Sequence, residues 1–172
     1  MAKPSSTQRE IQQTRPFRSK RQEALISLLL TADRVRRQSE QILAGSGLSL
    51  QQYNVLRILR GAGAEGLCTL AIAQRMIERA PGITRLLDRL EQAAYVTRTR
   101  GEHDRREVRC QISRSGLALL KDLDGVVEAS DDGCIGDLSA AELKQFLTLL
   151  ERVRAGLPTY MEIGRASCRE RV

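Results

Sequence analysis

Two arginines, Arg85 and Arg89, are the side chains of this 172-residue chain best suited to binding an anion. They are four residues apart, so on a helix they point the same way, and Thr84 and Asp88 share that face. A planar guanidinium can hold a phosphate, or the O6 and N7 atoms of guanine, through two parallel hydrogen bonds. The spacing therefore predicts a helix face that meets phosphates and base edges. The spacing alone does not indicate whether Arg85 or Arg89 would contact a base.

These arginines need a helix with an apolar stripe on its other side. That stripe is formed by residues three or four positions apart: Ile83, Leu86, Leu87, Leu90 and Ala94. Pro81 suits a first helical turn, because its missing N–H would have no intrahelical partner there. The helix is therefore expected to begin near Ala80 or Pro81. Its free N–H groups would then face an anion beside Thr84 and Arg85.

A shorter helix is predicted just before, over residues 69–77. Its apolar stripe consists of Leu70, Ala73, Met76 and Ile77, and Thr69 is placed to cap the first turn. Only residues 78–80 separate the two helices. Two amphipathic helices joined by so short a turn form a helix-turn-helix.

Two strands are predicted after the second helix. Residues 95–100 are rich in β-forming side chains and residues 101–104 favour a turn. Val108, Cys110 and Ile112 then alternate with Arg109 and Gln111. Alternation with a period of two predicts a strand with one buried face. A two-stranded ribbon after a helix-turn-helix makes a winged helix.

Asp104, Arg105 and Arg106 lie at the predicted tip of this wing. A narrow A·T-rich minor groove concentrates negative potential and attracts a guanidinium, and Asp104 is placed to orient Arg106 by a charge-assisted hydrogen bond. The alternative is an ordinary polar hairpin turn.

The run from Ala80 to Ser113 resembles the recognition helix and wing of the MarR family of bacterial transcriptional regulators. The family pattern of Asp-x-Arg, three residues, Val, x and Leu-Thr has its counterpart in Asp104, Arg106, Cys110, Ile112 and Ser113. Three of these depart conservatively: Cys replaces Val, Ile replaces Leu and Ser replaces Thr. The resemblance covers roughly residues 21–157. It implies a winged-helix dimer that binds operator DNA and often releases it on meeting a small ligand, and it favours Arg106 as the residue that enters the groove.

The expected DNA-binding residues come from the helix-turn-helix and the wing. They are Arg79, Pro81, Thr84, Arg85, Asp88, Arg89, Asp104, Arg105 and Arg106. Glu91 is expected to be structural and to pair with a neighbouring arginine. For Thr84, Arg85 and Arg89 the alternative is an ordinary solvated helix face.

Further helices are predicted on both sides of this unit. A long helix over residues 21–44 carries a broad apolar stripe that includes Leu25 and Leu29, and the segment from Gly45 to Gly47 ends it. Ser49, with Gln52 three residues later, opens the next helix as a capping box. That helix packs Tyr53, Leu56, Ile58 and Leu59 inward until Gly61 and Gly63 break it, and residues 65–68 add a short strand beside the wing.

Two more helices are predicted after the wing. Ser113 caps one whose apolar stripe contains Leu117, Leu120, Leu123 and Val127, and residues 131–137 interrupt it. Ser139 and Glu142 form a second capping box, and the last helix carries Leu143, Phe146, Leu147, Leu150 and Val153. These stripes hold more leucine than a small winged-helix core can bury.

The expected fold class is mainly α with a small β-wing, a winged helix-turn-helix whose amino- and carboxy-terminal helices form a dimerisation layer. Residues 1–20 are expected to form a flexible basic arm, either a plain solvated tail or an extra contact with DNA phosphates. Residues 21–48 and 114–158 form the helical dimerisation region, and residues 49–113 form the DNA-binding region. Residues 162–172 resemble a non-native tail and are excluded from the fold argument.

The charge distribution favours a nucleic-acid partner. The net charge is +7 and the pI is about 9.7. Residues 1–21 carry +5 and residues 79–109 carry +3, whereas residues 110–161 carry −3. The acidic carboxy-terminal helices are therefore expected to face away from DNA.

Other functional classes find little support. No apolar run approaches the roughly 20 residues of a membrane span, and the start of the chain lacks an apolar secretory segment, so a cytoplasmic protein with no membrane partner is expected. Cys68, Cys110, Cys134 and Cys168 have no metal-binding spacing, and His103 is the only histidine. With no glycine-rich phosphate loop and no acid–base pair, neither an enzyme nor a cofactor is expected.

Two modes of sensing remain open for a DNA-binding regulator. The family resemblance implies a pocket for a small aromatic or lipophilic anionic ligand. The alternative is thiol sensing through Cys68 or Cys134, because Cys110 falls on the inward face of a strand, where a buried hydrophobe is usual. A third possibility is a nonspecific architectural DNA-binding protein.

Overall fold

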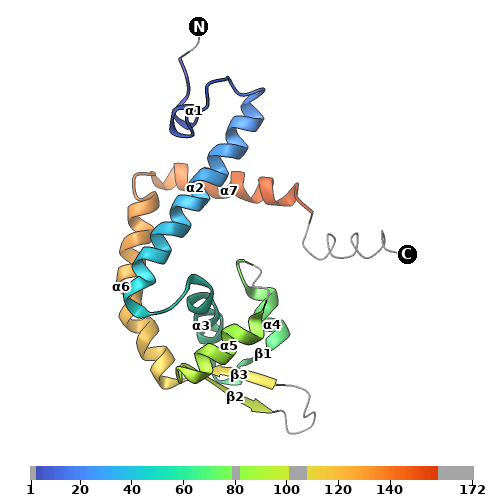
Figure 1. Ribbon diagram of the computed structural model, residues 1–172, viewed down its shortest axis with the longest axis vertical. Coiled ribbons are helices and arrows are strands. Elements are labelled where there is room, and N and C mark those ends of the chain that lie inside the picture. The colour runs from blue at the N-terminus through green and yellow to red at the C-terminus, as the bar shows by residue number, and fades with distance from the viewer. Residues whose placement is uncertain (1–2, 79–81, 101–107, 159–172) are drawn as a thin grey trace, which may run out of the picture. The chain divides into compact units, whose positions relative to one another are not determined.

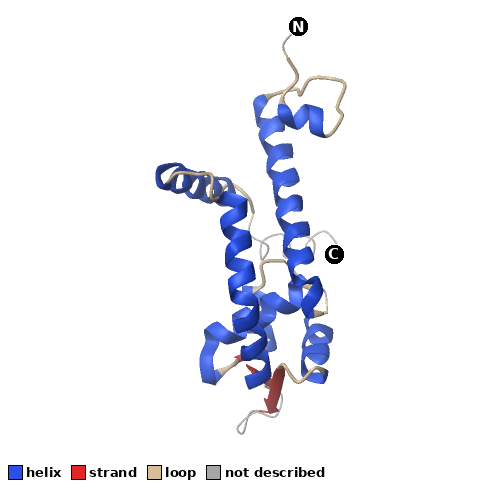
Figure 2. Cartoon of the chain, turned by 90° about the vertical axis from the view of Figure 1, so that its left-hand side faces the viewer, coloured by secondary structure: helices blue, strands red, loops and turns tan. Residues whose placement is uncertain are grey.

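A computed structural model describes residues 3–78, 82–100 and 108–158. The chain divides into two compact units, Met1–Ser130 and Asp131–Val172. Helices dominate both, and the strands form one small sheet in the first unit (Figures 1 and 2). The predicted class, mainly α with a small β-wing, is confirmed.

The elements follow one another in an order typical of a winged helix. They are α1 (Ser6–Glu10), α2 (Lys20–Leu43), the 3-10 turn η1 (Ala44–Ser46), α3 (Leu50–Ala62), the 3-10 turn η2 (Gly63–Glu65), β1 (Leu67–Cys68), α4 (Thr69–Arg75), α5 (Ile83–Gln92), β2 (Val96–Arg100), β3 (Val108–Ile112), α6 (Arg114–Ile135) and α7 (Ala140–Ala155). We call the segment from α3 to β3 the lobe.

The sheet of the lobe is antiparallel, with β3 between β1 and β2. Arg98 of β2 pairs with Cys110 of β3, and Leu67 of β1 pairs with Cys110 from the other side. The short strand predicted within residues 65–68 is therefore confirmed. In Figure 1, α3, α4 and α5 gather against these strands.

The core of the first unit joins the end of α2 to the lobe and to α6. Its buried apolar residues are Leu43, Leu48, Tyr53, Val55, Leu56, Leu59, Ile72, Leu87, Leu90, Val96, Cys110 and Leu120. Ile58 packs against this cluster from its edge. Leu117, predicted on the inward stripe of α6, is instead exposed.

Two predicted features of α4 are wrong. Leu70 is 68% exposed, because Ile72 is the residue of α4 that is fully buried; Ile77 is 82% exposed and lies beyond the helix, which ends at Arg75 rather than at residue 77 as predicted. Thr69 is the first helical residue and Cys68 is the N-cap, with no side-chain hydrogen bond. A helix of seven residues has too few positions for its apolar pattern to determine which side packs inward.

The predicted capping boxes of α3 and α7 are confirmed. Ser49 and Gln52 cap each other's backbone in α3, and Ser139 and Glu142 do the same in α7. Gly61 does not break α3 as predicted. The helix runs to Ala62 and ends at Gly63, whose φ of 66° is the left-handed conformation that a glycine adopts without strain.

The amino-terminal segment contains a helix that the sequence did not predict. Ser5 caps α1, Thr7 is buried, and Glu10 forms an ion pair with Arg34 of α2. A helix of five residues has too little periodicity to be recognised, and contacts with α2 support it. The flexible arm predicted over residues 1–20 therefore includes an ordered helix.

In the second unit α7 leaves its apolar side chains in contact with solvent. None of its residues is buried, and Leu147 is 52% exposed. The predicted interruption at residues 131–137 is wrong, because α6 continues to Ile135. One glycine lowers helix propensity by only about 1 kcal/mol, so Gly133 does not stop it.

Candidate nucleic-acid interface

The helix that carries the predicted DNA-binding arginines begins two or three residues later than the sequence suggested. Its N-cap is Gly82, with a φ of 97°, and Ile83 is the first residue of α5. A left-handed glycine at this point separates α5 from the chain before it, so the predicted start at Ala80 or Pro81 is wrong. Thr84 and Arg85 still lie in the first turn, where no side chain caps the free N–H groups.

The predicted apolar stripe of α5 holds the helix against the core. Leu87 and Leu90 are buried, and Ile83 and Leu86 are partly buried. Ala94 does not belong to this stripe. It lies beyond the helix end, exposed, with a φ of 57°.

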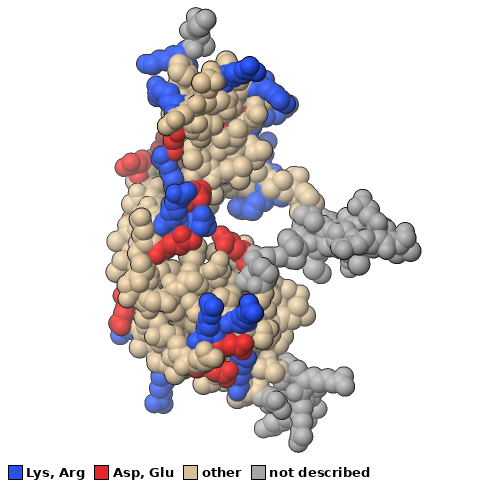
Figure 3. Space-filling view, viewed as in Figure 1, with Lys and Arg blue, Asp and Glu red and all other residues tan. Residues whose placement is uncertain are grey.

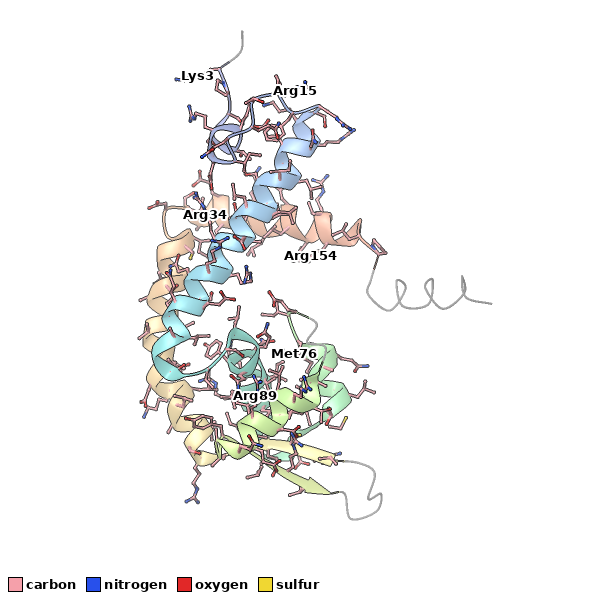
Figure 4. The ribbon with its side chains drawn as sticks, viewed as in Figure 1. Lys3, Arg15, Arg34, Met76, Arg89 and Arg154 are labelled. Atoms are coloured by element: carbon pink, nitrogen blue, oxygen red, sulfur yellow. The ribbon has the colours of Figure 1, made fainter. Side chains whose placement is uncertain are left out.

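The outward face of α5 presents Thr84, Arg85 and Arg89, all exposed. Arg89 projects from the helix in Figure 4. Neither arginine has an ion-pair partner among the described residues, so both guanidinium groups are available to an anion. Asp88, predicted on the same face, is only half-exposed and is engaged with the wing.

The partner of Asp88 is Arg98 of β2. Arg98 Nη1 lies 2.8 Å from Asp88 Oδ1, its Nη2 donates to the Thr84 carbonyl at 3.3 Å, and its Nε lies 3.5 Å from Glu91 Oε2. The prediction that Glu91 pairs with a neighbouring arginine is therefore confirmed.

Sequence reasoning did not single out Arg98. One signal was present: strand alternation puts Arg98 on the same face as the buried Val96, where a charge needs a partner. Asp88 and Glu91 lie three residues apart on the preceding helix and offer two carboxylates for it.

The described part of the wing adds polar side chains around the lobe. Thr97, Thr99 and Arg109 are exposed, and Arg109 Nη1 donates to the Glu65 carbonyl at 3.3 Å. Five predicted DNA-binding residues lie outside the described residues: Arg79, Pro81, Asp104, Arg105 and Arg106.

The start of α6 is joined to Ala94, two residues beyond the end of α5. The predicted cap is confirmed, since Ser113 Oγ accepts from the Gly116 N–H at 3.0 Å. The hydroxyls of Ser113 and Ser115 donate to the Ala94 carbonyl at 2.7 and 2.6 Å. Gly116 permits this approach, because a Cβ there would lie 2.4 Å from the Tyr95 carbonyl oxygen.

The lobe carries charged side chains on its surface and a thiol in its core. Figure 3 shows Lys and Arg side chains around the amino-terminal segment and, beside acidic ones, over the lobe. Cys110 is fully buried, and burial raises the pKa of its thiol, which suppresses the reactive thiolate. Within the described ranges, no group of three or more His, Cys, Asp or Glu residues could hold a metal ion, and no helix could cross a bilayer.

Known proteins are similar to this chain in both sequence and fold. The MarR family model matches residues 48–108. The crystal structure of a MarR transcription factor from Planctomyces limnophilus is 43% identical and has a TM-score of 0.62, over 79% of this chain and 98% of that one. The chain belongs to the MarR family.

Two further MarR-related comparisons agree. The HTH-type transcriptional regulator MhqR of Bacillus subtilis is 31% identical over 107 residues, which are 62% of this chain and 72% of MhqR. A mutant MarR from E. coli complexed with operator DNA is 22% identical, with a TM-score of 0.67 over 76% of this chain and 91% of that one, and shares the fold. This MarR-family chain is a DNA-binding transcriptional regulator.

Proposed function

We propose that the protein is a sequence-specific, ligand-responsive repressor that binds a palindromic operator as a homodimer. The observation that carries this proposal is the two-sided character of α5. Leu87 and Leu90 hold one side in the core, while Thr84, Arg85 and Arg89 are exposed on the other. A helix seated in the core with exposed arginines on its outer side is suited to the major groove.

Each exposed residue of α5 has a proposed task. Arg85, in the first turn, and Arg89, one turn later, hold phosphates or read guanine, and Thr84 contacts a phosphate or a base edge. Arg79 and Pro81 belong to the same contact region. Asp88 contributes through its ion pair with Arg98.

The wing tip supplies the second part of the proposed interface. Arg106, oriented by Asp104, enters the minor groove beside the half-site, and Arg105 holds a neighbouring phosphate. On this proposal Arg106→Ala weakens binding mainly to operators with A·T-rich flanks, and Arg106→Lys restores only part of the affinity because it lacks the planar fork. A uniform loss that Lys fully restores would instead indicate a simple phosphate contact.

The terminal helices support a homodimer. In one chain, Leu25 and Leu29 of α2 are 56% and 62% exposed, and the apolar face of α7 is unburied. Burying one such leucine contributes about 1.5 to 3 kcal/mol, which favours association through these faces. A dyad would place the two recognition helices one DNA turn apart, roughly 34 to 36 Å.

The proposed signal is a small aromatic or lipophilic anion, as the family resemblance implies. Thiol sensing stays the alternative. The burial and raised pKa of Cys110 argue against that residue, which leaves the half-buried Cys68 and the exposed Cys134 as its candidates.

The test begins by selecting operator sequences from random duplexes with the full-length protein. Binding of wild type, Arg85→Ala and Arg89→Ala to the selected duplex and to a scrambled one is then measured by fluorescence anisotropy at one salt concentration. Loss of a base contact should cost about 1 to 3 kcal/mol and relax preference at one position, whereas loss of a phosphate contact should weaken both duplexes alike. Arg154→Ala, a loss of equal charge on α7, is the control and should leave base preference unchanged.

Three outcomes would contradict parts of the proposal. Equal affinity of wild type for operator and scrambled DNA would indicate an architectural protein. Wild-type operator binding by both α5 mutants would remove the recognition-helix assignment. Release of operator by hydrogen peroxide in wild type but not in Cys134→Ser or Cys68→Ser, with no response to aromatic acids such as salicylate, would favour thiol sensing.

A further inference from the structure

Arg98 touches the recognition helix at three points, and nothing in the family comparison assigns it a role. We propose that Arg98 is a positioning residue for DNA recognition: it fixes α5 on the wing strand and neutralises the two carboxylates of that helix. The proposal rests on the proposed function, since it assumes that α5 meets DNA.

The contacts of Arg98 follow the length of α5. Its guanidinium reaches the Thr84 carbonyl in the first turn, the Asp88 carboxylate one turn later, and the Glu91 carboxylate beyond that. A rotation or slide of α5 on β2 would break these contacts together. One side chain therefore ties the orientation of the helix to that of the wing.

The surroundings of Arg98 make these contacts stronger than a surface ion pair. Its side chain is 20% exposed, and its buried Nε has Glu91 Oε2 as an ion-pair partner at 3.5 Å, without a hydrogen bond in the described part of the chain. A guanidinium removed from water in this way is held by its paired carboxylates. Because both carboxylates keep some contact with water, the pairs are weaker than fully buried ones.

The charges of α5 show why pairing matters for DNA. The helix carries two arginines, Arg85 and Arg89, and two acids, Asp88 and Glu91, so its own side chains sum to zero. Arg98, on β2, neutralises the charges of Asp88 and Glu91. The positive charges of the outward arginines are then available to phosphates. Without Arg98, two uncompensated carboxylates would stand beside the polyanion and repel it.

Replacing Arg98 removes two effects at once: the compensation of negative charge and the orientation of α5. The proposal predicts a different result for the loss of each. Loss of charge compensation should weaken binding to every DNA sequence, because it acts on the phosphate backbone. Loss of orientation should lower the ratio of operator to random affinity, because base contacts depend on how α5 enters the groove. If Arg98 were needed only for folding, its loss would change neither the affinity for DNA in general nor the operator-to-random ratio in protein that is still folded.

The experiment uses the full chain with three variants: Arg98→Gln, Arg98→Lys and the triple change Arg98→Gln, Asp88→Asn, Glu91→Gln. Dissociation constants for the selected operator and a scrambled duplex are measured over a salt series, and circular dichroism gives the melting temperature. Arg98→Gln should weaken operator binding at least tenfold and lower the operator-to-random ratio. The triple variant should recover affinity for random DNA while the ratio stays low.

Arg98→Lys should fall between wild type and Arg98→Gln, because a point charge on a flexible stem does not reproduce a planar fork with three contacts. The matched control is Arg60→Gln. Arg60 of α3 holds Asp124 of α6 through Nη1, 2.9 Å from each carboxylate oxygen, so this change breaks an Arg–Asp pair in the same unit but away from α5. Arg60 has no ion pair or hydrogen bond to α5 within the described residues, so this change should leave operator affinity unchanged at a temperature where the protein is folded.

Operator affinity and ratio equal to wild type in folded Arg98→Gln would overturn the proposal, as would an equal loss in Arg60→Gln. If Arg98→Gln does not fold, Arg98→Lys and the triple variant decide in the same way: wild-type ratios in both reject it. Failure of the proposed function looks different. Wild type would then fail to distinguish operator from random DNA, whereas failure of this inference alone leaves wild type specific and Arg85→Ala or Arg89→Ala impaired.

Discussion

The leucines of the lobe and those of α7 have opposite surroundings, although their helices start in the same way. Both α3 and α7 begin with a capping box and both carry an apolar stripe. Leu56 and Leu59 of α3 are fully buried, whereas Leu147 of α7 is half-exposed and no residue of α7 is buried. Local signals build a helix in either place, but among the described residues the leucines of α3 are buried and those of α7 are not.

The largest expected effect comes from removing a lobe leucine. Leu90→Ala should lower the free energy of unfolding by about 2 to 5 kcal/mol, because it deletes contacts of a fully buried side chain and leaves a cavity. Urea denaturation should show this loss at every protein concentration. Leu147→Ala is the matched change on α7, and its cost should appear only where the protein associates. A large, concentration-independent cost at Leu147 would show that α7 packs within its own chain.

A smaller effect is expected from the exposed face of α2. Leu29→Ala should weaken self-association by about 1.5 to 3 kcal/mol, roughly ten- to a hundredfold in dissociation constant, since it removes apolar area that the proposed dimer buries. Sedimentation velocity over a concentration series measures this. Leu70→Ala, an equally exposed leucine of the lobe, is the control and should not change the dissociation constant. A wild-type protein that stays monomeric and fully helical at micromolar concentration would reject the dimer.

The smallest effect concerns the cap of α7. Hydrogen bonds from the Ser139 hydroxyl and backbone N–H lower the pKa of Glu142 below its ordinary value of 4.5. A carboxylate with a lowered pKa stabilises the folded state fully above the unfolded pKa, and that stabilisation is lost as the pH falls through the folded pKa. Amide hydrogen exchange at the start of α7 should therefore speed up, relative to its intrinsic rate, only below about pH 4.5.

Glu142→Gln provides the control for this titration. The amide oxygen can still accept from the Ser139 N–H but cannot be protonated in this range. Its exchange protection should be independent of pH. An acid-induced loss of protection in Glu142→Gln equal to that of wild type would assign the effect to another group.

Features that depend on a few neighbouring residues were predictable from the sequence. The caps at Ser49, Ser113 and Ser139, the strand alternation around Cys110 and the buried face of α5 all follow from short-range rules. The outward position of Arg85 and Arg89 follows from that buried face, since it fixes the rotation of the helix. The part of the candidate site that lies on α5 was therefore predictable from helix periodicity.

Features that depend on packing between elements were not predictable in the same way. Arg98 meets Asp88 and Glu91 only because β2 turns back beside α5, and the spacing of the residues does not specify that approach. The inward side of α4 was predicted wrongly, because Ile72, two residues after Leu70, is the residue that is buried in the core. At α5, Pro81 suggested an early start, but the left-handed Gly82 delays it to Ile83.

The hydroxyls of Ser113 and Ser115 attach the start of α6 to Ala94, in the segment that directly follows α5. The 22 residues of α6 form a rod about 33 Å long, and the hydrogen bonds at its start reach Ala94, two residues beyond the end of α5. For a rigid rod of this length, a displacement of about 3 Å at the far end corresponds to a tilt of only about 5° at the junction. If α6 moves as a rigid rod, a movement at its far end would therefore reach the Ala94 junction as a change in angle of only a few degrees.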